Sequence, residues 1–212
     1  GLIGLLGSGR TELAMSLFGL NPANSGQIKI DGKTMKIKSP NTAKKHKIAM
    51  LPEDRITQGL FMERILRENI TSSIIDSVVR HKFLMDKKAE NDISEQAVEE
   101  LKIRTPSVET VVGNLSGGNQ QKVVIGKWVA TRPRVFIMDT PTVGIDIGSK
   151  AEIYEQIHKF ADQGMAILFI SDEIPEIMAN CNRVIVMRDG RCIRILEEED
   201  LEKPDAEKLI SE

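Results

Sequence analysis

The sequence has few of the residue types on which several specialised folds depend. Its two cysteines, Cys181 and Cys192, form no CxxC pair and no His/Cys cluster, which argues against a zinc site and a disulfide framework. Aromatic residues make up only 4%, so few rings are available to stack nucleic-acid bases. The 29 Lys and Arg residues nearly balance the 31 Asp and Glu residues, and we expect no nucleic-acid partner. No run approaches the roughly 18 apolar residues that a membrane span needs.

Short apolar runs alternate with longer segments of helical periodicity. Runs such as Val135–Met138 and Ala166–Ile170 are apolar almost throughout, which is typical of strands buried on both faces of a parallel sheet. This order predicts an α/β fold with a mainly parallel sheet flanked by helices. The predicted strands are Leu2–Leu6, Gln27–Ile30, Lys47–Leu51, Val135–Met138, Ala166–Ile170 and Arg183–Met187, and the predicted helices are Thr11–Phe18, Lys87–Leu101, Gln120–Ala130, Ser149–Ala161 and Asp205–Ile210.

Two segments carry the pattern of a β-hairpin on the edge of a sheet. Gln27–Lys33 and Val184–Ile193 each contain an Asp-Gly pair between alternating residues, and they predict an antiparallel β annex. The segment 60–106 has no strong strand pattern and is expected to be a mostly helical subdomain inserted between two core strands. Its apolar residues form either the core of that subdomain or a docking face.

A glycine-rich segment near the start has the form of a phosphate-binding loop. Residues 4–11, GLLGSGRT, follow an apolar strand and precede a helix, which is the context that this motif requires. The glycines let backbone N–H groups turn toward phosphate oxygens, and the helix N-terminus adds a partial positive charge. Taken alone, the loop also fits a structural turn. The predicted nucleotide-binding residues are Gly4, Gly7, Ser8, Gly9, Arg10, Thr11 and Glu12.

Two further motifs follow in order along the chain. Residues 114–121 read NLSGGNQQ, and Asp139 ends the apolar run that begins at Val135. Asp139 is followed by residues 141–146, PTVGID. Three motifs in this order resemble the nucleotide-binding domain of ABC ATPases, with Walker A at Gly4–Thr11, the signature at Leu115–Asn119, Walker B ending at Asp139 and the D-loop at residues 144–146.

The residues of three segments indicate a more specific group within this family. Residues 52–55 (PEDR), 114–122 and 171–176 (SDEIPE) are similar to the C-terminal half of the tandem ATPase subunits that drive bacterial importers of ribose, galactose, xylose and related monosaccharides. The resemblance implies a P-loop NTPase of ABC type over residues 1–212, with a helical subdomain at about 60–130 inserted in a RecA-like core. Because such domains normally begin with antiparallel strands before Walker A, we expect the N-terminal strands to be missing and the chain to be a fragment.

The resemblance also implies cofactors and partners. Two such domains associate head to tail around ATP and Mg²⁺, and Thr11 and Asp139 are the implied Mg²⁺ ligands. The implied partners are a second ABC domain, expected on the same full-length chain, transmembrane permease subunits and, indirectly, a periplasmic sugar-binding protein, at the cytoplasmic face of the membrane. The signature residues, which would face the partner's ATP, are Leu115, Ser116, Gly117, Gly118, Asn119 and Gln120, and Asp146 is the implied D-loop residue.

The sequence departs from the family pattern at four positions around the nucleotide. Thr140 stands where the family has its catalytic Glu, and a hydroxyl is a poor general base. Asp172 stands at the position of the switch His, where a carboxylate repels the γ-phosphate. Glu53 replaces the Q-loop Gln, and Arg10 replaces the Walker A Lys with a bulkier, planar cation. We therefore expect a degenerate site that binds nucleotide and hydrolyses it slowly, while the signature serves a competent partner site.

Two other functions are consistent with the family resemblance. The first is a soluble ABC ATPase of DNA repair or translation, although such proteins usually carry a coiled coil or a basic surface, which the sequence does not indicate. The second is a catalytically silent nucleotide sensor, which the substitutions at positions 140 and 172 favour and the intact signature disfavours.

Overall fold

The computed structural model describes residues 1–80 and 84–211, so that residues 81–83 of the predicted helical segment lie outside the described part. The chain divides into two units. The predicted limits of the helical subdomain, about 60–130, stay a prediction. The first unit comprises Gly1–Met50, Val135–Pro141 and Met165–Glu212, and the second comprises Leu51–Arg134 and Thr142–Gly164.

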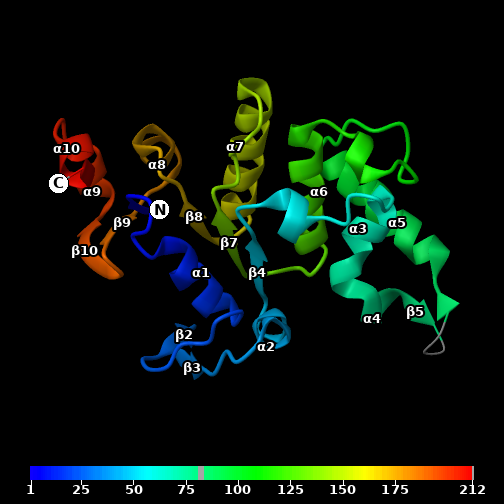
Figure 1. Ribbon diagram of the computed structural model, residues 1–212, viewed down its shortest axis with the longest axis horizontal. Helices are drawn as coiled ribbons and strands as arrows, with labels where there is room; N and C mark the ends of the chain where they lie inside the picture. Colours follow the sequence, from blue (N-terminus) through cyan, green and yellow to red (C-terminus); the bar gives the residue numbers. More distant parts are fainter. Residues whose placement is uncertain (81–83, 212) are drawn as a thin grey trace. The chain divides into compact units, whose positions relative to one another are not determined.

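A six-stranded sheet forms the centre of the first unit within the described residues (Figure 1). The strand order is β10-β9-β1-β8-β7-β4, and β1 pairs in parallel with both β8 and β9, as β7 does with β8. The predicted mainly parallel sheet is therefore confirmed. The strands are β1 (Leu2–Gly4), β4 (Ile48–Leu51), β7 (Val135–Asp139), β8 (Ala166–Ile170), β9 (Val184–Arg188) and β10 (Arg191–Leu196).

The continuous apolar runs occupy the interior of this sheet. Phe136, Ile137 and Met138 of β7 are at most 1% exposed, and α1 packs against this strand. Burial of an apolar side chain of this size contributes about 1.5–3 kcal/mol to folding. The apolar character of β7 is therefore explained by the burial of its side chains on both faces of the sheet.

The helices of the first unit begin at local signals in the sequence. Helix α1 starts at Arg10, one residue before the prediction, and it packs against β1 and β7. Sequence analysis missed α2, although Ser39 accepts a hydrogen bond from the Thr42 backbone N–H and Pro40 occupies the first turn. The helices are α1 (Arg10–Phe18), α2 (Pro40–Lys45), α8 (Ile174–Asn180), α9 (Glu198–Leu201) and α10 (Ala206–Ser211).

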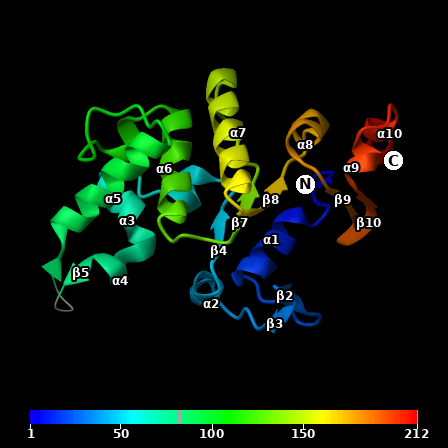
Figure 2. The ribbon, with the colours of Figure 1, turned by 180° about the vertical axis from the view of Figure 1, so that it is seen from behind.

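Both predicted hairpins form, and both turn at their Asp-Gly pair. Asp31 and Gly32 have φ angles of 51° and 74°, and Asp189 and Gly190 have 49° and 72°, which are the positive values that a type I′ turn requires. Both views show the first hairpin beyond the C-terminal end of α1 (Figures 1 and 2). It is a separate two-stranded sheet of β2 (Ile28–Ile30) and β3 (Lys33–Met35).

The second hairpin lies on the edge of the main sheet, as predicted, whereas the first forms a separate sheet. Because β9 pairs in parallel with β1, the β9–β10 hairpin continues the main sheet and β10 forms its antiparallel edge. A local turn signal specifies a hairpin and does not specify which strand lies beside it. Only the tertiary pairing with β1 decides this.

The second unit is mostly helical, with α6 packed against α3 and α7. Helix α6 begins three residues before the predicted start at Gln120, and Ser116 is its N-cap residue. Helix α7 begins two residues before its predicted start, because the Asp146 side chain caps it there. A short hairpin, β5–β6, was not predicted. The elements are a one-turn π-helix (Arg55–Gly59), α3 (Leu66–Thr71), α4 (Ile75–Val78), β5 (Val79–Arg80), β6 (Leu84–Met85), α5 (Lys87–Glu100), α6 (Gly117–Val129) and α7 (Ile147–Asp162). Among the helices described, none is both long enough and apolar enough to cross a bilayer.

Candidate functional site

The glycine-rich loop leaves the sheet at the end of β1. The predicted strand Leu2–Leu6 was too long, because the Ser8 backbone N–H donates to the Leu5 carbonyl at 3.0 Å and turns the chain. Leu5 and Leu6 are 80% and 94% exposed. The loop therefore projects from the end of the sheet and feeds directly into α1, as the motif predicts.

Three glycines give this loop its shape. Gly7 and Gly9 have φ angles of 79° and 95°, in the left-handed region that favours glycine. A Cβ atom on Gly4 would lie 2.3 Å from the Met187 carbonyl oxygen and 2.5 Å from the Ser8 Oγ atom. By contrast, a Cβ atom on Gly7 would meet no heavy atom within 4 Å. The backbone of the loop is therefore closely packed at its base and open at Gly7.

The polar groups of the loop fit a bound phosphate. Ser8 is 4% exposed, and its Oγ atom has no hydrogen-bond partner among the described residues. A buried hydroxyl without a partner is costly unless a ligand or water satisfies it. Arg10 is also buried, and its Nη1 atom donates to the Ser171 carbonyl at 2.8 Å. Thr11 and Glu12 follow in the first turn of α1.

The ends of the neighbouring strands lie at the same edge of the sheet. Asp139 ends β7 and is 1% exposed, and Thr140 donates its backbone N–H to the carbonyl of Ile170 at the end of β8. Parallel strands bring their carboxyl ends together, which is where ligands bind in open α/β sheets. Thr11 and Asp139 offer a hydroxyl and a carboxylate, and oxygen donors of this kind suit Mg²⁺.

A pocket of about 260 Å³ lies between the loop, the end of β9 and the segment that follows β8. Its lining includes the predicted residues Gly4, Gly7, Ser8 and Asp172, so the structure brings the switch position beside the phosphate loop. Asp172 is exposed. The role predicted for its carboxylate, which is to repel a γ-phosphate, stays a prediction.

Thr140 has an unusual backbone conformation. Its φ angle is 43°, and a β-branched residue in the left-handed region is strained, at a cost on the order of 1–3 kcal/mol. Its Oγ1 atom is buried and has no hydrogen-bond partner among the described residues. The position predicted to lack the catalytic Glu therefore has a strained backbone and an unsatisfied hydroxyl.

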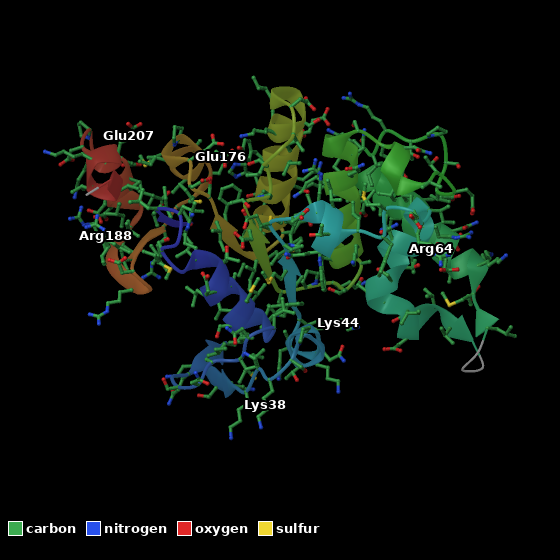
Figure 3. The ribbon with its side chains drawn as sticks, in the orientation of Figure 1. Lys38, Lys44, Arg64, Glu176, Arg188 and Glu207 are labelled. Atoms are coloured by element: carbon green, nitrogen blue, oxygen red, sulfur yellow. The ribbon has the colours of Figure 1, made fainter. Side chains whose placement is uncertain are left out.

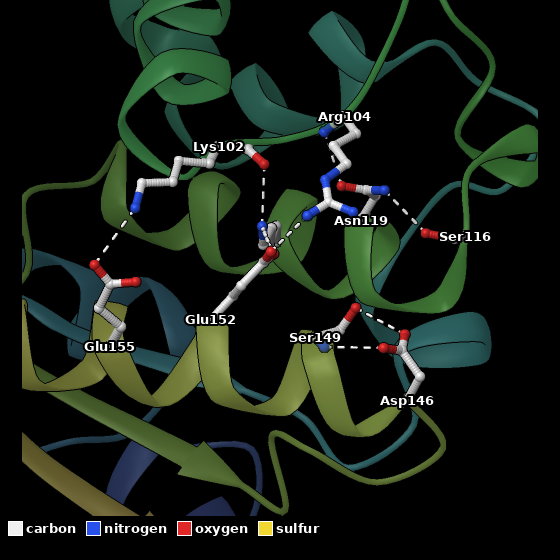
Figure 4. Close-up of polar contacts among 9 residues, drawn as sticks. Lys102, Arg104, Ser116, Asn119, Asp146, Ser149, Glu152 and Glu155 are labelled. Carbon is white, nitrogen blue, oxygen red and sulfur yellow. Dashed lines mark hydrogen bonds and ion pairs between the residues drawn. The ribbon is translucent and has the colours of Figure 1, made fainter.

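The signature residues lie at the start of α6 in the second unit. Ser116 is the N-cap residue and is exposed, and its Oγ atom accepts a hydrogen bond at 2.9 Å from the Asn119 Nδ2 atom (Figure 4). The Asn119 Oδ1 atom in turn accepts from the Arg104 backbone N–H at 2.8 Å. Because the serine oxygen already accepts from Asn119, its own proton is free to point outward as a donor.

Packing within the second unit also favours glycine at the two glycine positions of the signature. A Cβ atom on Gly118 would lie 2.3 Å from the Ser149 Oγ atom, and one on Gly117 would lie 2.9 Å from the Arg55 Nη2 atom. Sequence analysis explained both glycines by the approach of a phosphate. The structure adds that each makes room for a side chain of the same unit.

Asp146 of the predicted D-loop caps α7. Its carboxylate accepts from the Ser149 backbone N–H at 3.0 Å and from the Ser149 hydroxyl at 2.8 Å, and the backbone bond is the largest cause that holds the pKa of Asp146 below its usual value. A capping carboxylate at a helix N-terminus is also favoured by the helix dipole. The assignment of Asp146 as a D-loop residue stays a prediction.

A buried ion pair connects the signature helix α6 to α7 (Figure 4). Lys122 is 2% exposed, and its Nζ atom lies 2.6 Å from Glu152 Oε2 and donates to the Lys102 carbonyl at 3.0 Å. Arg104 lies 2.6 Å from the other carboxylate oxygen. The pKa of Glu152 is lowered, first by the hydrogen bond from Lys122. The contribution of this carboxylate to the free energy of unfolding is therefore fully present when the pH is above its usual pKa, and it is lost as the pH falls through the lowered pKa of the folded state.

We expect unequal effects when this pair is broken from its two sides. Glu152→Ala leaves a buried ammonium without its carboxylate and should cost about 2 kcal/mol of unfolding free energy, whereas Lys122→Met leaves Glu152 paired with the exposed Arg104 and should cost less than about 1 kcal/mol. Urea denaturation of both variants checks the order. An equal or reversed order would contradict the burial argument.

Glu53 follows β4, is exposed and belongs to the second unit, whereas the phosphate loop belongs to the first. Its predicted role as the Q-loop residue stays a prediction.

Sequence analysis missed several residues near these motifs. Arg188 (labelled in Figure 3) and Asp189 line the pocket beside the phosphate loop. The Gly190 backbone N–H donates to the Ser8 carbonyl at 3.0 Å. The turn at Asp189-Gly190 was predicted from the sequence. Its position beside the phosphate loop was not, because that position depends on the parallel pairing of β9 with β1.

Comparison with known proteins identifies the family. The family model described as ABC transporter matches residues 1–143. The ribose import ATP-binding proteins RbsA of Geobacillus kaustophilus and Yersinia pestis are both 44% identical to the chain, over 203 and 201 residues. These matches cover 96% and 95% of this chain but 41% and 39% of those proteins, in their C-terminal half, so the chain spans about two fifths of their length.

Solved structures show the same fold. MJ1267, an ATP-binding cassette of an ABC transporter, superposes with a TM-score of 0.83 at 22% identity, over 99% of this chain and 85% of that one. A nucleotide-free ATP-binding cassette from an ABC transporter gives 0.80 at 24% identity, over 97% of this chain and 84% of that one. The predicted ABC-type α/β fold is confirmed, and the chain belongs to the ABC transporter family.

Proposed function

We propose that this chain is the ATP-binding, energy-coupling domain of a bacterial monosaccharide importer. The observation that carries the proposal is the phosphate loop, where a buried, unpartnered Ser8 hydroxyl and the open backbone at Gly7 lie beside the ends of parallel strands. The similarity to ribose import ATP-binding proteins supports the substrate class.

The phosphate loop would hold the triphosphate of ATP. Its backbone N–H groups, the Ser8 hydroxyl and the start of α1 would surround the phosphates, and Thr11 with Asp139 would hold Mg²⁺. The metal would supply charge neutralisation at the phosphates. Arg10 would add positive charge from a buried position fixed by the Ser171 carbonyl.

The same site is poorly equipped for hydrolysis. Thr140 offers no general base, and the exposed carboxylate of Asp172 lines the pocket in which negative charge would develop. We therefore infer that this domain retains nucleotide and hydrolyses it slowly. A second ABC domain, bound head to tail, would carry the faster site.

The signature would act on the nucleotide of that second domain. The exposed Ser116, whose oxygen accepts from Asn119 and whose proton is free to donate, and the N-terminus of α6 would contact the partner's γ-phosphate. Permease subunits at the cytoplasmic face of the membrane, and a periplasmic sugar-binding protein beyond them, would complete the importer. Closing and opening of the domain pair would then be coupled to transport.

Nucleotide binding by this loop can be tested at Gly7. Gly7→Asp introduces a carboxylate into open space, and Asp tolerates positive φ better than most residues, so the fold should survive. We expect the affinity of this site for Mg-ATP, measured by equilibrium titration of the full-length protein with the second domain's site inactivated, to fall about tenfold or more.

Two matched variants control this experiment. Gly7→Asn has the same size and backbone tolerance without the charge, and Gly26→Asp places the same carboxylate at another open, positive-φ glycine of the same unit. Both should bind Mg-ATP nearly as the natural protein does. Equal affinity of the Gly7→Asp protein and the natural protein for Mg-ATP would refute nucleotide binding by this loop. Rapid ATP hydrolysis at this site in the natural protein would refute the proposal that the site is degenerate.

A further inference from the structure

Arg55 occupies a one-turn π-helix that directly follows the Q-loop position. Asp54 caps this turn, because its carboxylate accepts from the Ile56 backbone N–H at 2.8 Å, from the Thr57 backbone N–H at 3.3 Å and from the Thr57 hydroxyl at 2.5 Å. The hydrogen bond from the Thr57 side chain is the largest cause that lowers the pKa of Asp54. The capped turn fixes the direction in which the Arg55 side chain leaves the backbone.

The Arg55 guanidinium reaches two segments that are far away in the sequence. Its Nη1 and Nη2 atoms donate to the carbonyls of Val143 and Gly144 at 3.1 Å and 3.2 Å, and its Nε atom donates to Gln120 Oε1 at 3.5 Å. Gln120 is buried and donates its own amide to the Leu115 carbonyl at 3.0 Å. One planar cation thus bridges the D-loop and the signature segment, which a rigid fork of donors is suited to do.

Glycines make room for the guanidinium on both sides. A Cβ atom on Gly117 would lie 2.9 Å from Nη2, and one on Gly144 would lie 3.4 Å from Nη1. Gly144 also has a φ angle of 71°, which other residues rarely adopt. The arrangement therefore depends on an arginine at 55 and on small residues at 117 and 144, three positions from three separate motifs.

We propose that Arg55 is a positioning residue that holds the loop 142–146 and the start of α6 in one fixed arrangement. This inference rests on the proposed function, in which Ser116 and the start of α6 contact the partner domain's nucleotide. The Arg55 side chain would transmit any displacement of residues 52–59 to both of these elements, because it bonds to each of them. Arg55 does not itself need to touch the nucleotide.

The proposal is tested by hydrogen exchange and turnover in the full-length protein. In Arg55→Ala we expect amide exchange across residues 142–149 to become faster and kcat for ATP hydrolysis to fall about tenfold, the usual scale for lost hydrogen bonds to a charged group, with little change in KM. Arg55→Lys should give intermediate exchange and partial activity, because one compact ammonium reaches one carbonyl instead of forking to two.

Arg64→Ala is the matched control. Arg64 is an exposed arginine of the same unit whose side chain makes no hydrogen bond or ion pair with the described residues, so its variant should behave as the natural protein. Unchanged exchange at 142–149 in Arg55→Ala would overturn the positioning role. Faster exchange with unchanged kcat would overturn its link to turnover. Failure of the shared nucleotide site would instead be detected by Ser116→Arg, which leaves the Arg55 contacts in place.

Discussion

Replacement of Ser116 by Arg is expected to abolish ATP turnover of the assembled pair of domains, by 100-fold or more. The side chain of Ser116 is exposed at the N-cap of α6, so a larger residue finds space outside the core. A long cation there would fill the position proposed for the partner's γ-phosphate and remove the hydroxyl that Asn119 orients. The measurement is steady-state hydrolysis by the full-length protein in its importer.

Two comparisons separate this effect from a loss of folding. Ser116→Thr keeps the hydroxyl and should retain most of the activity. The free energy of unfolding of Ser116→Arg should change by less than about 1 kcal/mol, as is usual for exposed positions. Normal ATP turnover by the Ser116→Arg protein would refute the proposal that the signature contributes to the partner's nucleotide site. Any function of this chain in hydrolysis would then depend on its own nucleotide site.

Restoration of Glu at position 140 and His at position 172 is expected to raise hydrolysis at this domain's own site by about 100-fold. Glu supplies the missing general base, and His replaces a repelling carboxylate in the pocket beside the phosphate loop with a hydrogen-bond donor. The substitution at 140 also removes a β-branched residue from a strained backbone position, so it should not weaken the fold. Single-turnover hydrolysis with the second domain's site inactivated measures the gain.

Amide variants distinguish catalysis from relief of strain. Thr140→Gln has the shape of Glu without its basicity, and Asp172→Asn removes the charge without introducing an imidazole. If the carboxylate at 140 acts as the base, the Gln protein should stay slow and only the Glu protein should gain activity. No gain in the double variant, despite retained nucleotide binding, would refute the view that these two positions limit turnover.

The phosphate loop and the hairpin turns were predictable because their signals are local. A run of glycines before a helix, and an Asp-Gly pair between alternating residues, restrict the backbone whatever surrounds them. The structure shows positive φ at Gly7, Gly9 and both Asp-Gly pairs accordingly. The start of α5 at Lys87 was predicted correctly, whereas α6 and α7 begin three and two residues before their predicted starts. The Asp146 side chain caps α7 and decides where that helix begins.

Contacts between distant segments were not predictable in the same way. Nothing in the sequence near Arg55 indicates that its guanidinium would reach the Val143 and Gly144 carbonyls, since this requires the packing of α6 and the D-loop around it. The partnership of Lys122 with Glu152 likewise depends on how α6 meets α7. The charge of a side chain follows from its residue type, but the residue with which it pairs cannot be predicted from the sequence alone.

The sequence by itself determined the family, the α/β order, and the identity of the residues at each motif, because residue type, turn chemistry and motif order are local properties. Only the tertiary structure decided that the β9–β10 hairpin pairs with β1, that Asp172 lines the pocket of the phosphate loop, and that Arg55 joins the D-loop to the signature. These features depend on strand pairing and helix packing between residues far apart in the chain, which are fixed by the burial of the whole core.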